Sequence, residues 1–128
     1  IGYLGAIAGT LQGLIMPGLW FDHGELEFYI FFLQHGGGPV AAIFLVWGLG
    51  IVPAQGAMKR SVFWSLGYMV VVIFINWLIG ANYGFLNHKP TGGSLFDHMG
   101  PWPFYLGTLQ VIAYTLYFFL LKIAPRKK

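Results

Sequence analysis

The sequence predicts an all-α fold: a polytopic transmembrane helical bundle with four spans, at about residues 2–19, 26–51, 61–86 and 101–123. The first reason is composition, because only 9% of the residues are charged and 57% are apolar, against roughly 25% charged in soluble domains. The second is that four stretches contain no Asp, Glu, Lys or Arg, at 1–21, 28–58, 61–88 and 98–121. Each can cross a bilayer once, since a spanning helix needs about 20 residues. We therefore expect a single transmembrane domain over residues 1–128.

The same composition excludes other classes of protein. Disorder requires low hydrophobicity and high charge, and this chain has neither. The chain has no cysteine, so it holds no disulfide and no thiol nucleophile. A net charge of +3 does not indicate a nucleic-acid partner, and no nucleotide-binding or metalloenzyme motif is present. We expect membrane lipids as partners, and neither a cofactor nor a metal.

The first two predicted spans are marked by glycine and proline. Span 2–19 ends near Pro17, and a signal peptide or a re-entrant segment is the alternative interpretation. Within it Gly5, Gly9 and Gly13 recur every four residues, which predicts a seam for close helix packing. Span 26–51 contains the run GGGP at 36–39, which is typical of close helix approach or of a local break.

The third and fourth spans, 61–86 and 101–123, flank a turn-rich loop. Pro101 and Pro103 suit the first turn of the fourth helix, where backbone N–H groups have no partner. Ser94, with Asp97 three residues later, predicts a capped short turn in this loop.

Charge sign predicts the orientation of the bundle. Lys59 and Arg60 lie between the second and third spans, while Lys122 and residues 126–128 follow the fourth, so these basic residues share one side. The positive-inside rule makes this side cytoplasmic, together with both ends of the chain. We expect a multi-pass protein of the cell membrane whose acidic loops face outward.

Polar side chains fall at one predicted depth in all four spans. Gln12, His35, Asn76 and Gln110 lie between about 10 and 15 Å below the outer ends of their spans, at 1.5 Å per residue. We expect one shared cavity, with Tyr83 on the same helix face as Asn76. The alternative is that Gln12, Asn76 and Gln110 only form hydrogen bonds between helices.

His35 is the ionisable residue deepest within a span, tyrosines apart. Because a histidine exchanges protons near neutral pH, His35 is a candidate general base, and a structural histidine is the alternative. His23, His88 and His98 lie in outer loops near acidic residues. Their spacing matches no known ligand pattern, so we predict no metal site there.

Four segments resemble motifs of the C-terminal part of the bacterial YwaF-like integral membrane proteins. They are GTLQGLIMPGL at 9–19, FFLQHGG at 31–37, NWLIGANYGFLNHKP at 76–90 and SLFDHMGPWPFY at 94–105. The last two motifs supply a set of outer-loop signature residues: Asn82, Lys89, Pro90, Asp97, Pro101, Trp102 and Pro103.

That family is similar to eukaryotic transmembrane acyltransferases of ether phospholipids, and more distantly to hydrolases of fatty-acid esters of hydroxy fatty acids. The resemblance implies lipid acyl chemistry with an intramembrane Cys or Thr nucleophile and a histidine base, which here is His35. Family members carry a Leu-Cys motif in an earlier helix. We therefore expect this chain to be a C-terminal part that lacks two or three N-terminal spans and the nucleophile, with Thr10 as a weak substitute.

Three functions remain open. A lipid acyltransferase or ester hydrolase would use His35 as base, and Asn76, Tyr83 and Gln110 would orient it or stabilise an oxyanion. A scaffold would use the polar residues only to hold helices together, including the preceding helices or a second copy. A transporter would carry protons on His35 with a broken helix at 36–39, but the inverted repeat common in transporters is not visible.

Overall fold

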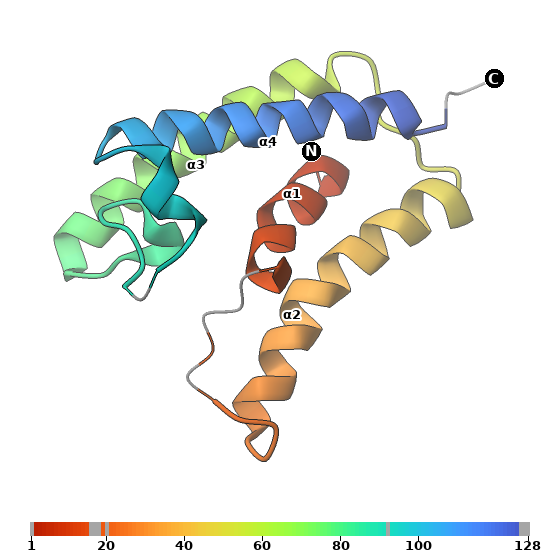
Figure 1. Ribbon diagram of the computed structural model, residues 1–128. Helices are drawn as coiled ribbons and strands as arrows, with labels where there is room; N and C mark the ends of the chain where they lie inside the picture. Colours follow the sequence, from red (N-terminus) through yellow and green to blue (C-terminus); the bar gives the residue numbers. More distant parts are fainter. Residues whose placement is uncertain (1, 16–18, 20, 92, 126–128) are drawn as a thin grey trace.

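The computed structural model describes residues 2–15, 19, 21–91 and 93–125, and over these residues it is helical with no strand (Figure 1). The long elements are α1 (Gly2–Ile15), α2 (Leu26–Ile43), α3 (Ala57–Ile79) and α4 (Phe104–Ile123). A π-helical turn, η1 (Phe44–Gly48), extends α2, and two short 3-10 helices, η2 (Tyr83–Phe85) and η3 (Leu95–Met99), lie between α3 and α4. The predicted all-α fold is confirmed.

Three of the described helices are long and apolar enough to cross a membrane: α2 with its π turn, α3 and α4. They are apolar on the outside as well, since Leu33 of α2 is 75% exposed and Trp77 of α3 is 73% exposed. A helix that is apolar all round belongs in a lipid environment or in the core of a large protein. The fourth helix, α1, has 14 residues, fewer than the 2–19 predicted for the first span.

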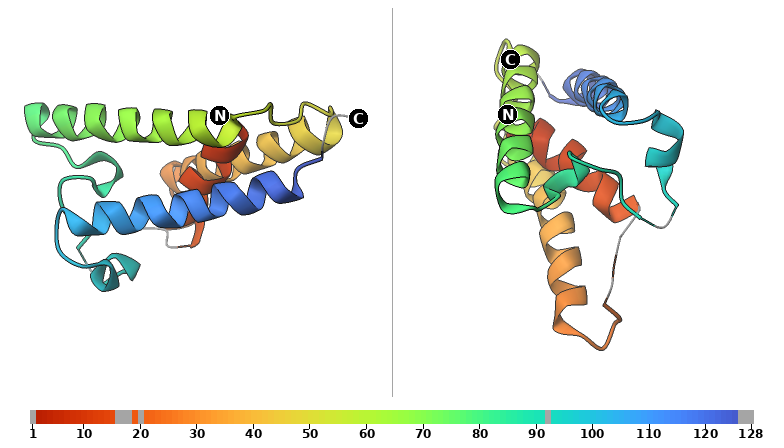
Figure 2. Two further views of the ribbon diagram at one scale, coloured as in Figure 1. Left: turned by 90° about the horizontal axis from the view of Figure 1, so that it is seen from above. Right: turned by 90° about the vertical axis from the view of Figure 1, so that its left-hand side faces the viewer.

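The helices are arranged around α1. α3 and α4 run antiparallel and side by side, and α1 lies between this pair and α2 (Figures 1 and 2). α2 leans away from α3 and α4 and packs mainly on α1. The hydroxyl of Tyr3 donates to the Leu120 carbonyl at 3.1 Å, so the start of α1 is tied to the end of α4.

Two helix boundaries near the basic end differ from the prediction. The second span was expected to reach residue 51, but the helix ends with η1 at Gly48 and Gly50 takes a left-handed φ of 66°. The third helix begins at Ala57 rather than Ser61, directly after Gly56, which is also left-handed at φ 73°. Lys59 therefore lies in the first turn of α3 and not in a loop.

The outer end of the third span was predicted seven residues too far along the chain, at 86 instead of Ile79. Gly80 takes the left-handed conformation (φ 67°, ψ 25°) that commonly ends helices. The N–H of Ala81 then donates to the Asn76 carbonyl at 3.0 Å, which satisfies a free carbonyl of the last turn. Residues 80–86 form the start of the loop and not the last turns of the span.

The prolines expected inside the first turn of the fourth helix precede it. α4 begins at Phe104, with Pro103 at the N-cap. The carbonyls of Pro101 and Pro103 accept from the N–H groups of Tyr105 and Leu106, at 3.2 and 3.0 Å. A residue before proline is disfavoured in helical conformation, which keeps Trp102 out of the helix.

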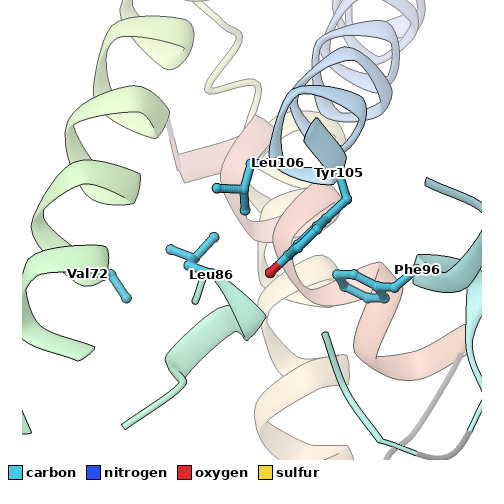
Figure 3. Close-up of a cluster of buried hydrophobic side chains, with 5 residues drawn as sticks. All are labelled: Val72, Leu86, Phe96, Tyr105 and Leu106. Carbon is cyan, nitrogen blue, oxygen red and sulfur yellow. The ribbon is translucent and has the colours of Figure 1, made fainter. Parts of the chain in front are cut away.

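The main buried cluster of the described chain lies where the loop between α3 and α4 covers the end of α3 and the start of α4. It consists of Val72, Leu86, Phe96, Tyr105 and Leu106 (Figure 3). The ring of Tyr105 is fully buried between Leu86 and Phe96, and its hydroxyl donates to the Phe85 carbonyl. This cluster fixes the loop to the ends of two helices.

Candidate functional site

His35 lies in α2 in a defined orientation. Its ring stacks on that of Phe31, one turn earlier, with the ring centroids 4.1 Å apart and the planes at 23°. Its Nδ1 lies 2.9 Å from the Phe31 carbonyl oxygen. A carbonyl only accepts, so Nδ1 carries the proton, and in the neutral ring Nε2 keeps a lone pair. The contacts with Phe31 therefore fix the orientation of the ring and its neutral tautomer.

The ring of His35 fits against a glycine of α1. A Cβ built on Gly13 would lie 2.5 Å from Cδ2 and 2.9 Å from Nε2 of His35. Carbon atoms in contact are normally about 3.5–4.0 Å apart. A residue larger than glycine at this position would displace the imidazole.

The contact between α1 and α2 only partly follows the predicted glycine seam. A Cβ on Gly5 or Gly9 would have no atom within 4 Å, so of the three glycines only Gly13 is at a close approach. Gly38 of α2 faces the side chains of Ala6 and Thr10. A Cβ built on Gly38 would lie 3.7 Å from Ala6 and 3.8 Å from Thr10. The seam of α1 runs through positions 6, 10 and 13, because a helix face repeats at three to four residues.

The GGGP run does not break α2. The helix continues from Leu26 to Ile43 with Pro39 inside it. Of the two interpretations of this run, the local break is not found. Gly38 faces α1, but a Cβ there would be at ordinary contact distance, so close helix approach stays a prediction.

A cavity of about 310 Å³ lies on the other side of α1, between α1, α3 and α4. Most of its lining is apolar, including Leu11 and Ile15 of α1. Its polar lining residues come from α3 and α4: Ser65, Tyr68, Gln110 and Tyr117. A mostly apolar pocket with a few polar groups is the usual form of a small-molecule site.

Two polar side chains of this cavity, those of Ser65 and Gln110, already take part in hydrogen bonds within the protein. Gln110 donates its Nε2 hydrogen to the sulfur of Met69 at 3.4 Å, and a thioether is a weak acceptor. The hydroxyl of Ser65 donates to the Val62 carbonyl at 2.9 Å and lies 3.5 Å from that of Tyr114. Among the described residues, the Gln110 amide therefore makes only this weak bond.

The structure does not bring the predicted polar layer into one cavity. His35 packs against Gly13 of α1, whereas the cavity with Gln110 borders positions 8, 11 and 15, which lie on another face of α1. Asn76 is three residues from the end of α3, about 4–5 Å along the axis, and not at the predicted depth. The side chain of Gln12 lies outside the described residues.

Asn76 organises the outer loop. It is 1% exposed, and its amide donates to the Tyr83 carbonyl at 3.1 Å and to Asn87 Oδ1 at 3.3 Å. Its own oxygen accepts from the Tyr83 N–H at 2.8 Å. The ring of Tyr83 is 61% exposed, so Asn76 binds the Tyr83 backbone and not its side chain. The expectation that the two side chains share a helix face was wrong, because α3 ends before Tyr83.

The loop signature residues mostly hold the loop itself. Asn82 accepts from the N–H groups of Asn87 and His88, at 3.0 and 3.1 Å, and donates to the His88 carbonyl at 2.8 Å. The indole N–H of Trp102 donates to the Leu86 carbonyl at 3.2 Å. Lys89 places its ammonium group 5.8 Å from the centre of the Tyr105 ring.

The predicted turn at Ser94 is present as η3. The Asp97 carboxylate accepts from the Ser94 N–H at 2.8 Å. The Ser94 hydroxyl is buried and has no hydrogen-bond partner in the described part of the chain. Pro90 lies in the loop between η2 and η3, and Pro101 lies between η3 and α4.

The outer histidines do not converge. His23 lies beside Asp22, with its Nδ1 2.6 Å from the carboxylate, and both side chains are exposed. The backbone N–H of His23 and then its ring stabilise the charged carboxylate and lower the pKa of Asp22. Within the described ranges, no group of three or more His, Asp or Glu side chains could hold a metal ion.

Two hydroxyl residues that line the cavity, Ser65 and Tyr68, were not predicted from the sequence. Their signal was spacing, because Ser61, Ser65 and Tyr68 are four and three residues apart on one face of α3. Ser61 is 3% exposed, and its hydroxyl has no hydrogen-bond partner within the described ranges.

The fold and the site thus define a multi-pass helical membrane protein with polar groups between its helices. The chain belongs to the TMEM164 family, whose model matches residues 1–121. No curated protein and no solved structure matches the chain.

Proposed function

We propose that this protein acts on the acyl groups of membrane lipids, by acyl transfer or ester hydrolysis, with His35 as general base. The observation that carries the proposal is the bond from His35 Nδ1 to the Phe31 carbonyl, which leaves Nε2 as the basic atom. His35 lies about 13 Å along α2 from Leu26, at 1.5 Å per residue. Ionisable groups at such depth are rare and mostly functional.

In this reaction, His35 Nε2 takes the proton of a hydroxyl, thiol or water nucleophile as that atom attacks the ester carbonyl carbon. The ester C–O bond then breaks, and the proton passes from the imidazolium to the leaving alkoxide. Thr10 is a poor nucleophile here because its hydroxyl donates to the Ala6 carbonyl of its own helix. The proposal therefore takes the nucleophile from outside the described residues.

The cavity between α1, α3 and α4 lies across α1 from His35, so in this proposal it would hold a lipid chain and not the ester bond on which His35 acts. Its apolar lining suits a hydrocarbon, and Gln110 offers an amide that is only weakly engaged. In this proposal Asn76 stabilises the loop between α3 and α4 and does not orient His35. A scaffold function is the alternative, favoured by the structural bonds of Asn76 and Asn82. The unbroken α2 removes the main support for a transporter.

The proposed orientation places the basic ends of α3 and α4 in the cytoplasm of a cell. Lys59 and Arg60 at the start of α3 lie at the same end of the bundle as Lys122 at the end of α4, because the two helices are antiparallel. Residues 126–128 lie outside the described residues. Labelling of single cysteines introduced at Gln55 and at Thr91 with a membrane-impermeant reagent tests this orientation.

The test of the enzyme uses the protein expressed from its complete reading frame, in nanodiscs of mixed phospholipids. Acyl exchange and free fatty acid are followed by mass spectrometry for the wild type, His35→Ala and His35→Gln. Gln34→Ala is the matched control, because Gln34 is the exposed neighbour of His35. We expect both His35 variants to lose about 10²–10⁴-fold in rate, and the control to lose little.

Equal rates in the wild type and the His35 variants, at equal yield of folded protein, would remove His35 from the chemistry. No product from a folded wild type would refute the acyl-transfer proposal for the lipids tested. In either case the scaffold would become the leading function.

A further inference from the structure

A second cavity, of about 510 Å³, lies at the basic end of the bundle. It is formed by α1, by the end of α2 with its π turn, and by residues 51–54 of the connection to α3. Its walls are mainly small and apolar, including Ala42, Val46, Pro53 and Ala57. Arg60 is the only charged residue in the lining.

An apolar cavity of this size in a membrane favours an apolar occupant. Its lining atoms would lack contacts on one side, and each missing contact forfeits dispersion energy. Lipid chains are the apolar material at hand. The cavity lies where the helices of the bundle end, so a lipid whose chain enters it would leave its headgroup near the first turn of α3.

Arg60 determines which headgroup fits. A Cβ on Gly56 would lie 3.3 Å from a guanidinium nitrogen of Arg60, so the guanidinium extends back over the turn before α3. Among the described residues no carboxylate pairs with Arg60. The four acidic residues of the sequence, Asp22, Glu25, Glu27 and Asp97, all lie in or next to the outer loops.

The setting of Arg60 adds to its attraction for an anion. A helix N-terminus carries a partial positive charge, so basic residues in a first turn work against the helix dipole. The first turn of α3 contains no acidic residue, but it contains Lys59 and Arg60. The counter-charge for this end of α3 must come from outside the described chain.

We propose that this cavity binds an anionic phospholipid, with the phosphate on the Arg60 guanidinium and one acyl chain between α1 and α2. Arginine suits this role because its planar donors bind phosphate oxygens in pairs. Basic pockets between membrane helices are known to take acidic lipid headgroups. The site is separate from His35 and does not depend on catalysis.

The experiment compares dioctanoyl phosphatidylglycerol with dioctanoyl phosphatidylcholine, which has the same chains and no net charge. The complete protein in neutral detergent is titrated with each lipid, and the bound lipid is counted by native mass spectrometry. Arg60→Gln removes the guanidinium, and Lys59→Gln is the matched control because Lys59 does not line the cavity. Ala54→Trp fills the cavity and keeps every charge.

We expect phosphatidylglycerol to bind at least tenfold more tightly than phosphatidylcholine. Arg60→Gln should remove this preference, and Ala54→Trp should weaken the binding of both lipids at least tenfold. Lys59→Gln should weaken phosphatidylglycerol no more than about fivefold, the effect of one cation near a charged surface.

Three results would overturn the proposal, with folding of each variant checked by circular dichroism. Equal losses in Arg60→Gln and Lys59→Gln would mean a diffuse surface charge and no site. Equal affinity of the wild type for the two lipids would mean that the headgroup is not recognised. Unchanged binding in a folded Ala54→Trp variant would place the lipid elsewhere.

Discussion

Replacing Gly13 by alanine tests the packing that holds His35. The added methyl group would lie 2.5 Å from Cδ2 and 2.9 Å from Nε2 of the imidazole. Against a normal contact of about 3.5–4.0 Å, the ring or α1 must move by about 1 Å or more. The imidazole cannot swing freely, because it is bonded to the Phe31 carbonyl and stacked on the Phe31 ring.

Overpacking of this kind typically costs about 1–3 kcal/mol, and we expect Gly13→Ala to lower the free energy of unfolding by that amount. Gly9→Ala is the control on the same helix, since a Cβ there meets no atom within 4 Å. It should be neutral or stabilising, because alanine is favoured over glycine inside a helix by roughly 0.5–1 kcal/mol.

The assay is unfolding in mixed micelles by titration with a denaturing detergent, monitored by tryptophan fluorescence. A double-mutant cycle with His35→Ala isolates the contact. Once the imidazole is absent, Gly13→Ala should behave like Gly9→Ala, which gives a coupling energy of about 1–3 kcal/mol. The contact would be refuted if Gly13→Ala left the free energy of unfolding unchanged. It would also be refuted if Gly13→Ala lowered this free energy equally with and without the imidazole.

Three further predictions concern the loop, the cavity and the outer surface. Asn76→Ala should cost about 1–3 kcal/mol, because it leaves the part-buried backbone N–H and carbonyl of Tyr83 unpaired, and hydrogen exchange of the loop amides should accelerate. Gln110→Leu should change stability by less than about 1 kcal/mol, close to the mean near 0.6 for polar pairs in membranes, as measured by the same unfolding titration. The pKa of Asp22 should lie below that of an ordinary aspartate and rise part of the way back in His23→Ala, because the ring is lost while the backbone N–H remains; its carboxyl ¹³C shift reports this titration. Because the pKa of Asp22 is lowered, its carboxylate keeps the hydrogen bonds to His23 at pH values above that pKa. These bonds are lost as the pH falls through the pKa and the carboxylate is protonated.

Charge segregation was sufficient to predict the helices, and glycine conformation explains where the predicted ends were wrong. The charge-free stretches located three spanning helices and the shorter α1, because hydrocarbon excludes charged side chains whatever their partners. The end of α3 was missed because the stretch without charged residues continues beyond Gly80 to residue 88. Hydropathy contains no information on backbone conformation, so it could not show that Gly80 is left-handed. A glycine at this position was nevertheless a sequence signal for the end of a helix.

Depth was a poorer guide to the candidate site than helix faces. Counting residues placed His35, Asn76 and Gln110 at one level, but the outer end of α3 was assigned wrongly, and α1 lies between His35 and Gln110. Which face of α1 meets which helix depends on how four helices pack in three dimensions. The close approach at Gly13, in contrast, followed from small residues alone.

The position of α1 between α2 and the pair of α3 and α4 has a consequence for how the protein is assembled. α1 and α2 leave the ribosome before α3 and α4, and their seam of small residues can close before α3 is made. The later hairpin of α3 and α4 must then dock on the free side of α1, where Tyr3 meets Leu120. A gene divided between Gly50 and Gly56 should therefore yield two hairpins that insert independently and recombine in the membrane.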